Sequence, residues 1–382
     1  MTPPSPGTAF ETAAAAVRPT DLAGAGAAAD ARTDLLTKPK GSLGRLEALG
    51  SRLAAIARVC PPPVPERATV CVFAGDHGVL AQGVSPWPAE VTAQMVANFC
   101  AGGAAVTVFA RQACADVLVT DVGVSTPIPA DSPTLLRRTV RRGTADLSTG
   151  PAMSPAEARA ALDVGAEVAA RAVTDGAQLL VTGEMGIGNT TPAAALIAAF
   201  TGRPAEEVTG RGTGIDDETL HRKTDIVAGA VARLAADASP LTVLAEVGGL
   251  EIAALAGLIV GGAAAGVPVL VDGVISAAAA LVASALVPDA RGYLIAGHLS
   301  AEPGAAAALH ALRLEPLLAL GMRLGEGSGA TLAIPLVQAA ARVLSEMATF
   351  GEANVDDAPA EQAAPDHPEP AGTMASTASS TA

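Results

Sequence analysis

Apolar and polar positions follow one another in blocks that predict short strands and longer helices in alternation. Each predicted strand is a run of mostly aliphatic residues that ends at a glycine or a polar residue, and a helical pattern follows it. The predicted strands are residues 69–74, 117–122, 178–182, 267–271 and 293–296. Strands that alternate with helices through glycine loops indicate βαβ units, so we expect an α/β fold with a mostly parallel sheet flanked by helices.

Helical spacing of apolar residues predicts the other elements. The predicted helices are residues 43–58, 92–113 with a break at Gly102-Gly103, 155–174, 193–200 and 331–343. Ligands of parallel sheets bind at the carboxyl ends of the strands. Polar residues gather at these ends: Asp76, His77, Asp121, Glu184, Asn189, Asp272, His298 and Ser300.

One apolar stretch permits two interpretations. Residues 252–271 carry no charge and are long enough to span a bilayer. Glycine recurs in this stretch, Pro268 interrupts it, and its bulk is alanine. This composition favours a buried helix, a turn and a buried strand over a membrane span, so we expect no membrane partner. The two ends of the chain, residues 1–10 and 352–382, have the low-complexity composition of disordered segments.

Composition narrows the class of protein. Half of the 382 residues are apolar, 16% are charged, and the net charge is −14. Aromatic residues make up only 2% and basic residues form no large cluster, which argues against nucleic-acid binding. The four cysteines lack CxxC spacing and the five histidines lack an HExxH pattern. We therefore expect no metal site and a reducing, cytoplasmic location.

A single carboxylate among glycines is the most conspicuous candidate for chemistry. Glu326 lies between Gly325 and Gly327, after one apolar segment and before the predicted helix 331–343. Glycine lets the backbone turn tightly and approach a ligand, and a carboxylate held between apolar segments is a candidate general base. The alternative is a surface loop with an incidental glutamate.

A strand, a glycine loop and a helix start follow one another at residues 179–192. Thr191 suits the N-cap and Pro192 the first helical position. Backbone N–H groups at a helix start attract anions, so the loop is a candidate phosphate site. The loop residues concerned are Gly186, Gly188, Asn189, Thr190 and Thr191. The loop is neither a P-loop nor a GxGxxG fingerprint, and a plain strand-to-helix turn is the alternative.

Two further segments carry candidate ligand groups. Residues 209–216 are rich in glycine and precede Lys223, whose charge would neutralise a phosphate, although a surface lysine is the alternative. Ser300 offers a hydroxyl at a strand end, two residues after His298. An ordinary cap would explain Ser300 equally well.

Together these segments resemble the nicotinate-nucleotide–dimethylbenzimidazole phosphoribosyltransferase family of cobalamin lower-ligand assembly. The matching segments are residues 38–47, 74–79, 183–192, 297–302 and 323–329. The resemblance implies a large Rossmann-like domain at 66–305 and a small helical domain built from 11–65 and 306–351. It also implies a homodimer. The expected binding partners are small-molecule substrates, and we expect no cofactor.

The reaction that the resemblance implies moves a phosphoribosyl group from nicotinate mononucleotide to 5,6-dimethylbenzimidazole. The pyridinium leaving group is already cationic and the incoming base must lose a proton, so one carboxylate suffices, in contrast to the pair in glycosidases. In-line attack inverts the anomeric carbon and gives an α-ribotide. The resemblance assigns Glu326 as the base and places Glu184 and Lys223 near the active centre. It places the 186–191 loop, Ser300 and Gly325 around the phosphate and ribose.

The segment for the acceptor base departs from the family pattern. The family has a serine before, and a glutamine after, the Glu-Val-Thr stretch that aligns here at residues 90–92. Trp87 falls at the serine position and Met95 at the glutamine position. The residues expected around the base are Ser85, Trp87, Gln94, Met95, Met185 and Leu324. Transfer to benzimidazole, adenine or a phenol is therefore an alternative, as is a nucleotide-binding regulator without catalysis, against which the intact Glu326 loop argues.

Overall fold

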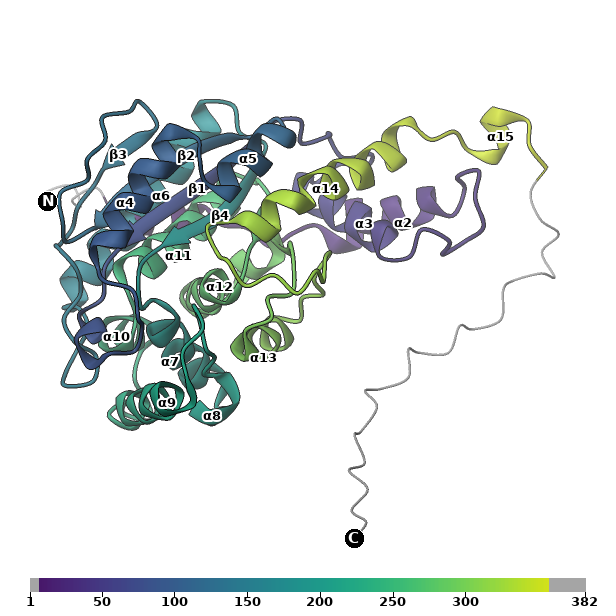
Figure 1. The fold of residues 1–382 in the computed structure, drawn as a ribbon. Helices are drawn as coiled ribbons and strands as arrows, with labels where there is room; N and C mark the ends of the chain where they lie inside the picture. Colours follow the sequence, from purple (N-terminus) through teal and green to yellow (C-terminus); the bar gives the residue numbers. More distant parts are fainter. Residues whose placement is uncertain (1–6, 357–382) are drawn as a thin grey trace, which may run out of the picture.

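The computed structural model describes residues 7–356, which contain one sheet of six parallel strands with helices on both faces (Figure 1). The strands are β1 (Ala68–Gly75), β2 (Asp116–Gly123), β3 (Leu135–Arg137), β4 (Leu179–Met185), β5 (Val269–Val271) and β6 (Leu294–Ala296). They pair in the order β3-β2-β1-β4-β5-β6. The predicted α/β fold is confirmed.

The helices connect the strands and cover both faces of the sheet. They are α1 (Ala9–Ala16), α2 (Ala27–Thr33), α3 (Arg45–Ala57), α4 (Glu90–Ala101), α5 (Ala105–Gln112), α6 (Pro155–Thr174), α7 (Thr190–Thr201), α8 (Ala205–Val208), α9 (Asp217–Ala232), α10 (Pro240–Val247), α11 (Leu250–Ala264), α12 (Val274–Leu286), α13 (Pro303–Leu312), α14 (Ser328–Glu346) and α15 (Phe350–Ala353), with short turns η1 (Leu22–Gly26), η2 (Gly78–Gln82) and η3 (Pro288–Tyr293). α4, α5 and α14 pack on one face of the sheet, where Val70 and Val72 of β1 meet them. α11 and α12 pack on the other face, against Cys71 and Phe73, with α6, α7 and α10 behind them.

The order of the strands reverses between β1 and β4. The chain builds the sheet outward from β1 to β2 and β3, then returns through α6 to place β4 on the other side of β1. Ala74 near the end of β1 pairs with Met185 at the end of β4, so the loops after both strands leave the sheet at the same edge. Such a reversal opens a crevice outside the carboxyl ends of the strands, where ligands bind in Rossmann-like sheets.

Residues 252–271 form a buried helix and a buried strand, as predicted. Every residue of α11 except Ala264 is buried. Its close contact with α6 requires glycine, because a Cβ at Gly257 would lie 2.0 Å from the carbonyl oxygen of Leu162. A different segment of the described chain, Glu90–Gln112, is long and apolar enough to span a membrane. It is divided into α4 and α5 at Gly102, and its length and composition alone are weak evidence for a span.

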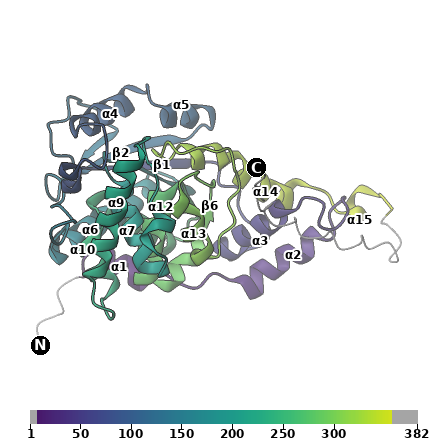
Figure 2. The same cartoon turned by 60° about the horizontal axis from the view of Figure 1, so that its bottom comes forward.

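Two segments far apart in the sequence, residues 22–57 and 328–353, meet in a helical projection beside the sheet (Figures 1 and 2). α14 begins at the sheet and packs along α3, against which η1 and α2 also pack. A small apolar cluster joins these helices: Ala25, Ala29, Ala54 and Leu344. The backbone N–H of Thr37 donates to the carbonyl oxygen of Ala348, which ties these two segments together.

Three predicted boundaries are corrected. α1 begins at Ala9 and α15 ends at Ala353, so each overlaps a segment predicted to be disordered, 1–10 and 352–382. Residues 1–6 and 357–382 of those segments lie outside the described residues. α1 also packs on α6 and α11 beside the sheet, whereas the prediction grouped residues 11–65 with the small helical domain. Apolar spacing identifies a helix but does not identify the neighbour against which it packs.

The sequence prediction missed β3 and misplaced the start of α7. β3 has three residues, pairs with one neighbour and is only partly buried, so it carries little hydrophobic signal. The N-cap of α7 is Asn189, and Thr191, which was predicted to be the cap, is fully buried within the first turn.

Candidate active site

A cavity of about 720 Å³ opens at the carboxyl ends of β4, β5 and β6. Its wall contains most of the site residues predicted from the sequence: Trp87, Met95, Glu184, Met185, Gly186, Asn189, Thr190, Ser300, Leu324, Gly325 and Glu326. The predicted residues that do not line it are Ser85, Gln94, Gly188, Thr191 and Lys223. Residues far apart in the sequence therefore converge on one cavity.

Glu326 sits on a short left-handed turn just before α14. Gly325, Glu326 and Gly327 have φ angles of +86°, +66° and +93°, and this conformation is strained for the one residue that has a Cβ. The Glu326 residue is 6% exposed, and its Oε2 has no hydrogen-bond partner among the described residues. Burial raises the pKa of this carboxyl; the backbone N–H of Val106 opposes the shift in pKa, and the charge of Asp272 adds to it. A carboxylate of this kind is a stronger base than an exposed one.

Glu184, at the end of β4, supports the same turn. Its Oε1 accepts a hydrogen bond from the backbone N–H of Glu326 at 3.3 Å, and its Oε2 accepts one from the side-chain amide of Asn189. Burial raises the pKa of Glu184 to about 8; the Asn189 hydrogen bond lowers the pKa, and Asp272 and Glu251 raise it. A Cβ at Gly325 would lie 2.2 Å from Glu184 Oε1, so only glycine permits this contact.

The predicted phosphate loop is divided between cavity and core. Gly186 lines the cavity and has no room for a side chain, since a Cβ would lie 2.2 Å from the Gly75 carbonyl oxygen. Thr190 is the first residue of α7 and lines the cavity. The Asn189 amide is already used by Glu184, and Thr191 is buried in the core. The N-terminus of α7 still faces the cavity, and Thr190 is the residue there that carries a hydroxyl group.

Lys223 lies behind the cavity wall and does not line it. Only 1% of the residue is exposed, and its Nζ donates to Thr190 Oγ1 at 2.8 Å and to the Gly210 carbonyl oxygen at 2.9 Å. Burial lowers the pKa of Lys223 to about 8, against the opposing effect of Glu302. The alternative of a surface lysine is wrong. The ammonium group of Lys223 lies behind Thr190, which lines the cavity.

The other side of the cavity is apolar. Trp87 and Leu324 are 51% and 56% exposed at its mouth, and Met95 and Met185 lie further in. The hydroxyl of Ser85 accepts a hydrogen bond from the backbone N–H of Trp87 at 3.2 Å and so shapes the segment before α4. Ser85 and Gln94 do not reach the cavity, and Gln94 is exposed.

Several lining residues were not predicted as site residues. They are Val91, Ile187, Gly212, Thr213, Gly273, Val274, Ile275, His298, Glu302, Met322 and Arg323. Of these, His298 and the 209–216 segment were noted in the sequence as candidate ligand groups. Apolar residues such as Val274 give no such signal, because an apolar position at a helix start is equally typical of the core.

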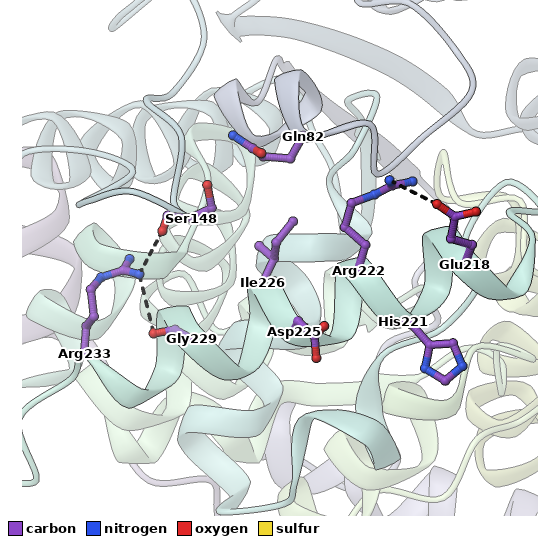
Figure 3. A pocket seen from close by; sticks show the side chains of 9 residues that line it. All are labelled: Gln82, Ser148, Glu218, His221, Arg222, Asp225, Ile226, Gly229 and Arg233. Carbon is purple, nitrogen blue, oxygen red and sulfur yellow. Dashed lines mark hydrogen bonds and ion pairs between the residues drawn. The ribbon is translucent and has the colours of Figure 1, made fainter.

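A second hollow of about 590 Å³ lies over α9, on the opposite face of that helix from Lys223. Figure 3 shows that its two arginines are paired with neighbouring groups. Arg233 donates to the carbonyl oxygens of Ser148 and Gly229, and Arg222 pairs with Glu218. These pairings leave the larger cavity as the candidate active site. Within residues 7–356 no group of three or more His, Cys, Asp or Glu side chains is arranged to hold a metal ion.

Comparison with known proteins places this chain in a known class. A family model described as "Phosphoribosyltransferase" matches residues 18–355, so the fold and its site define a phosphoribosyltransferase. The nicotinate-nucleotide–dimethylbenzimidazole phosphoribosyltransferase of Salinispora tropica is 56% identical over 360 residues, which cover 91% of this chain and 99% of that protein. The protein of the same name from Thermus thermophilus is 54% identical over 324 residues, which cover 85% of this chain and 96% of that protein.

A solved structure agrees with the sequence relatives. The crystal structure of CobT from Thermus thermophilus superposes with a TM-score of 0.85 at 53% identity, covering 87% of this chain and 99% of that chain. The chain belongs to the nicotinate-nucleotide–dimethylbenzimidazole phosphoribosyltransferase family, and the resemblance noted in the sequence is confirmed.

Proposed function

We propose that this protein transfers the phosphoribosyl group of nicotinate mononucleotide to 5,6-dimethylbenzimidazole in cobalamin biosynthesis, with Glu326 as the general base. The observation that carries the proposal is the Glu326 carboxylate, which is buried in the cavity wall with Oε2 unpartnered among the described residues. Relatives that are named for this activity are more than half identical in sequence to the chain.

The proposed step needs one proton acceptor. The benzimidazole attacks C1′ of the ribose through its unprotonated ring nitrogen, and the bond between C1′ and the pyridinium nitrogen breaks. Nicotinate leaves with the bonding electron pair and needs no acid, because its ring nitrogen becomes neutral. Positive charge develops on the benzimidazole, and Glu326 accepts the proton of its other ring nitrogen. The burial that raises the pKa of Glu326 makes it a better base for this task.

The polar part of the cavity suits the nucleotide. The N-terminus of α7 carries a partial positive charge that favours a phosphate. The Thr190 and Ser300 hydroxyls line the cavity, and Lys223 adds a positive charge behind Thr190. We therefore infer that the 5′-phosphate binds between α7 and Ser300, with Gly186 allowing close approach of the ribose.

The apolar part of the cavity suits a flat aromatic acceptor. Trp87, Val91 and Met95 come from α4 and the segment before it, and Leu324 closes the opposite side next to Glu326. An aromatic face such as that of Trp87 stacks on heterocycles. This arrangement supports a benzimidazole that lies between Trp87 and Leu324.

We also infer a cytoplasmic homodimer. Large apolar side chains are exposed on the helical projection and near the cavity, among them Leu22 at 65%, Leu35 at 59% and Leu320 at 60%. Exposed apolar side chains are typical of surfaces that a partner covers. Analytical ultracentrifugation at micromolar concentration should give twice the mass of the chain, and a monomer would contradict the inference.

The test of the proposed function combines products and one substitution. The purified protein is incubated with nicotinate mononucleotide and a panel of bases, and the products are identified by mass. Glu326→Gln keeps the size of the side chain but removes the proton acceptor, so turnover should fall by roughly 10²–10⁴-fold while nucleotide binding is kept. Turnover close to that of the parent across neutral pH would remove Glu326 from this role.

A further inference from the structure

A buried aspartate after β5 lies directly beneath the Glu326 turn. Asp272 is 2% exposed and does not line the cavity. Its Oδ2 accepts a hydrogen bond from the backbone N–H of Gly327 at 3.2 Å, and its Oδ1 accepts one from the backbone N–H of Ala330 at 2.8 Å. Gly327 is the N-cap of α14 and has no side chain, so Asp272 caps this helix from another element.

Two buried acidic side chains therefore hold two successive N–H groups of the left-handed turn. Glu184 at the end of β4 accepts from Glu326, and Asp272 after β5 accepts from Gly327. These strands are neighbours in the sheet, so the rigid sheet sets the spacing of the two acceptors. A left-handed conformation is unfavourable for Glu326 and persists only where its surroundings impose it.

We propose that Asp272 is a positioning residue for the transfer reaction, which clamps the Gly325–Gly327 turn to the sheet and so aims the Glu326 carboxylate into the cavity. This inference rests on the proposed role of Glu326 as the base. His298 belongs to the same arrangement, since its Nε2 lies 3.3 Å from Asp272 Oδ1. The His298 ring also packs so closely on α14 that a Cβ at Gly329 would lie 2.2 Å from its Cδ2.

The principal test is Asp272→Asn in the full chain. An asparagine of equal size keeps one acceptor but turns an N–H₂ group towards the other backbone N–H. The turn should therefore shift in this variant. A displacement of the Glu326 carboxylate by up to about 1 Å should lower kcat by roughly 10–100-fold. The KM for nicotinate mononucleotide should stay within about twofold, because Thr190 and Ser300 are untouched.

Asp121→Asn is the matched control. Asp121 is a buried aspartate near the end of a strand, and it accepts hydrogen bonds from the backbone N–H of Val124 and the Thr139 hydroxyl, away from the cavity.

The pH profile separates positioning from general stabilisation. The charged or titratable groups near Glu326 are Glu184 on β4, Asp272 after β5, His298 after β6 and Arg323 before the turn, while α5 offers the Val106 backbone N–H. Burial and, less strongly, the charge of Asp272 raise the pKa of Glu326. Asp272→Asn removes that charge, so the acid limb of the kcat profile should move to lower pH while the plateau falls. A purely structural loss would leave the limb in place.

Two further measurements make the outcome decisive. In the Glu326→Gln background, Asp272→Asn should reduce the residual rate by less than about threefold, because neighbours that act through one residue are not additive. Amide hydrogen exchange of residues 326–330 should be faster in Asp272→Asn than in Asp121→Asn. If Asp272→Asn cannot be purified, Gly327→Ala disturbs the same turn, because Gly327 has φ +93° and its Cβ would lie 3.0 Å from the Thr182 carbonyl oxygen.

The possible failures are distinguishable. Parent-like kcat in Asp272→Asn, or an equal loss in both backgrounds, would overturn the positioning role. Unchanged exchange at residues 326–327 would overturn the clamp itself. Parent-like turnover of Glu326→Gln alone would instead overturn the proposed base, and the exchange result would then still decide whether Asp272 holds the turn.

Discussion

Glu326 combines two features that are unfavourable for stability and that its proposed role as the base would explain. Its backbone is left-handed, and its carboxylate is buried without a partner for Oε2 among the described residues. Residues with a Cβ lose about 1–2 kcal/mol in this conformation. Such strain concentrates at sites where the position of a side chain matters more than stability.

A stability comparison tests this interpretation. Glu326→Gly should be more stable than Glu326→Ala by about 1 kcal/mol, because glycine adopts φ +66° without strain. Thermal and urea unfolding of both variants give the difference. The same pair of substitutions at Ser328, in the first turn of α14, should show the opposite order, since alanine is favoured there by up to about 1 kcal/mol. Equal stability of the two Glu326 variants would contradict a strained turn.

At the scale of elements, the packing of α9 against α7 brings a positive charge to the start of α7, where we infer that the phosphate binds. Lys223 on α9 is buried and bonded to Thr190 at the start of α7. Arg222, the preceding residue of the helix, faces the second hollow on the outer side of α9 (Figure 3). The helix thus presents one cation to the site and another to solvent.

This pair of residues provides a controlled experiment on nucleotide binding. Lys223→Met keeps most of the buried volume and removes the charge, so it should weaken binding of nicotinate mononucleotide by about tenfold. Binding of nicotinate riboside, which lacks the phosphate, should change much less. Arg222→Met should leave both affinities unchanged. Calorimetric titration measures all four values, and equal losses for both ligands would show that Lys223 does not serve the phosphate.

We expect α4 and the segment before it to determine which acceptor base is used. Trp87 lies at the mouth of the cavity, and Met95 of α4 stands in the wall, at the position where the resemblance noted in the sequence implies a glutamine. Rejection of a wrong base depends mainly on polar groups that it leaves unpaired, and an apolar, adaptable wall provides few of them. We predict that 5,6-dimethylbenzimidazole is preferred and that unsubstituted benzimidazole is also used well.

Competition between the two bases checks this prediction. Trp87→Ala should lower kcat/KM for both by a similar factor of roughly 2–10, because stacking of about 0.5–1.5 kcal/mol does not depend on the methyl groups. Gln94→Ala, on the exposed side of α4, is the control and should change neither. Strong exclusion of benzimidazole by the parent, or full activity of Trp87→Ala, would contradict this view of the cavity.

At the scale of the whole molecule, buried ionisable groups should give stability a marked dependence on pH. The pKa of Glu184 is raised to about 8 by burial, so the folded protein keeps a proton that the unfolded chain loses near pH 4.5. Stability from this group therefore falls as pH rises from about 4.5 to 8. The raised pKa of Glu326 acts in the same direction. Lys223 acts oppositely above pH 8, because burial lowers its pKa to about 8 and the unfolded chain holds its proton up to about 10.5.

Unfolding experiments at several pH values test whether Glu184 lowers the free energy of unfolding as pH rises. Glu184→Gln lacks the titrating group, so it should gain stability relative to the parent as pH rises from 5 to 8, by an amount on the order of a few kcal/mol. The two proteins should be closest near pH 5. Urea unfolding at pH 5, 6, 7 and 8 measures the difference, and a gap that narrows with rising pH would contradict a raised pKa of Glu184.

Much of the architecture follows from local pattern. Five of the six strands, the buried helix and strand at 252–271, and the helix 155–174 were predicted from apolar spacing and glycine positions. The glycine-bounded Glu326 and the 186–191 loop were also singled out, because glycines next to polar residues at strand ends are a local signal, although Gly188 and Thr191 of that loop do not line the cavity. β3 and the start of α7 were not, since a three-residue edge strand and a two-residue shift of a cap change the local pattern too little.

Contacts between distant residues were decided only by the tertiary structure. The pairing of β4 with β5 brings Glu184 and Asp272 under one turn, although these two residues lie far apart in the sequence. The packing of α9 on α7 hides Lys223 behind Thr190, and the rotation of α4 turns Met95 inward and Gln94 outward. Local sequence encodes the type of an element through its own periodicity. The register of the sheet and the rotation of each helix depend instead on the whole core, and these set which side chains meet in the site.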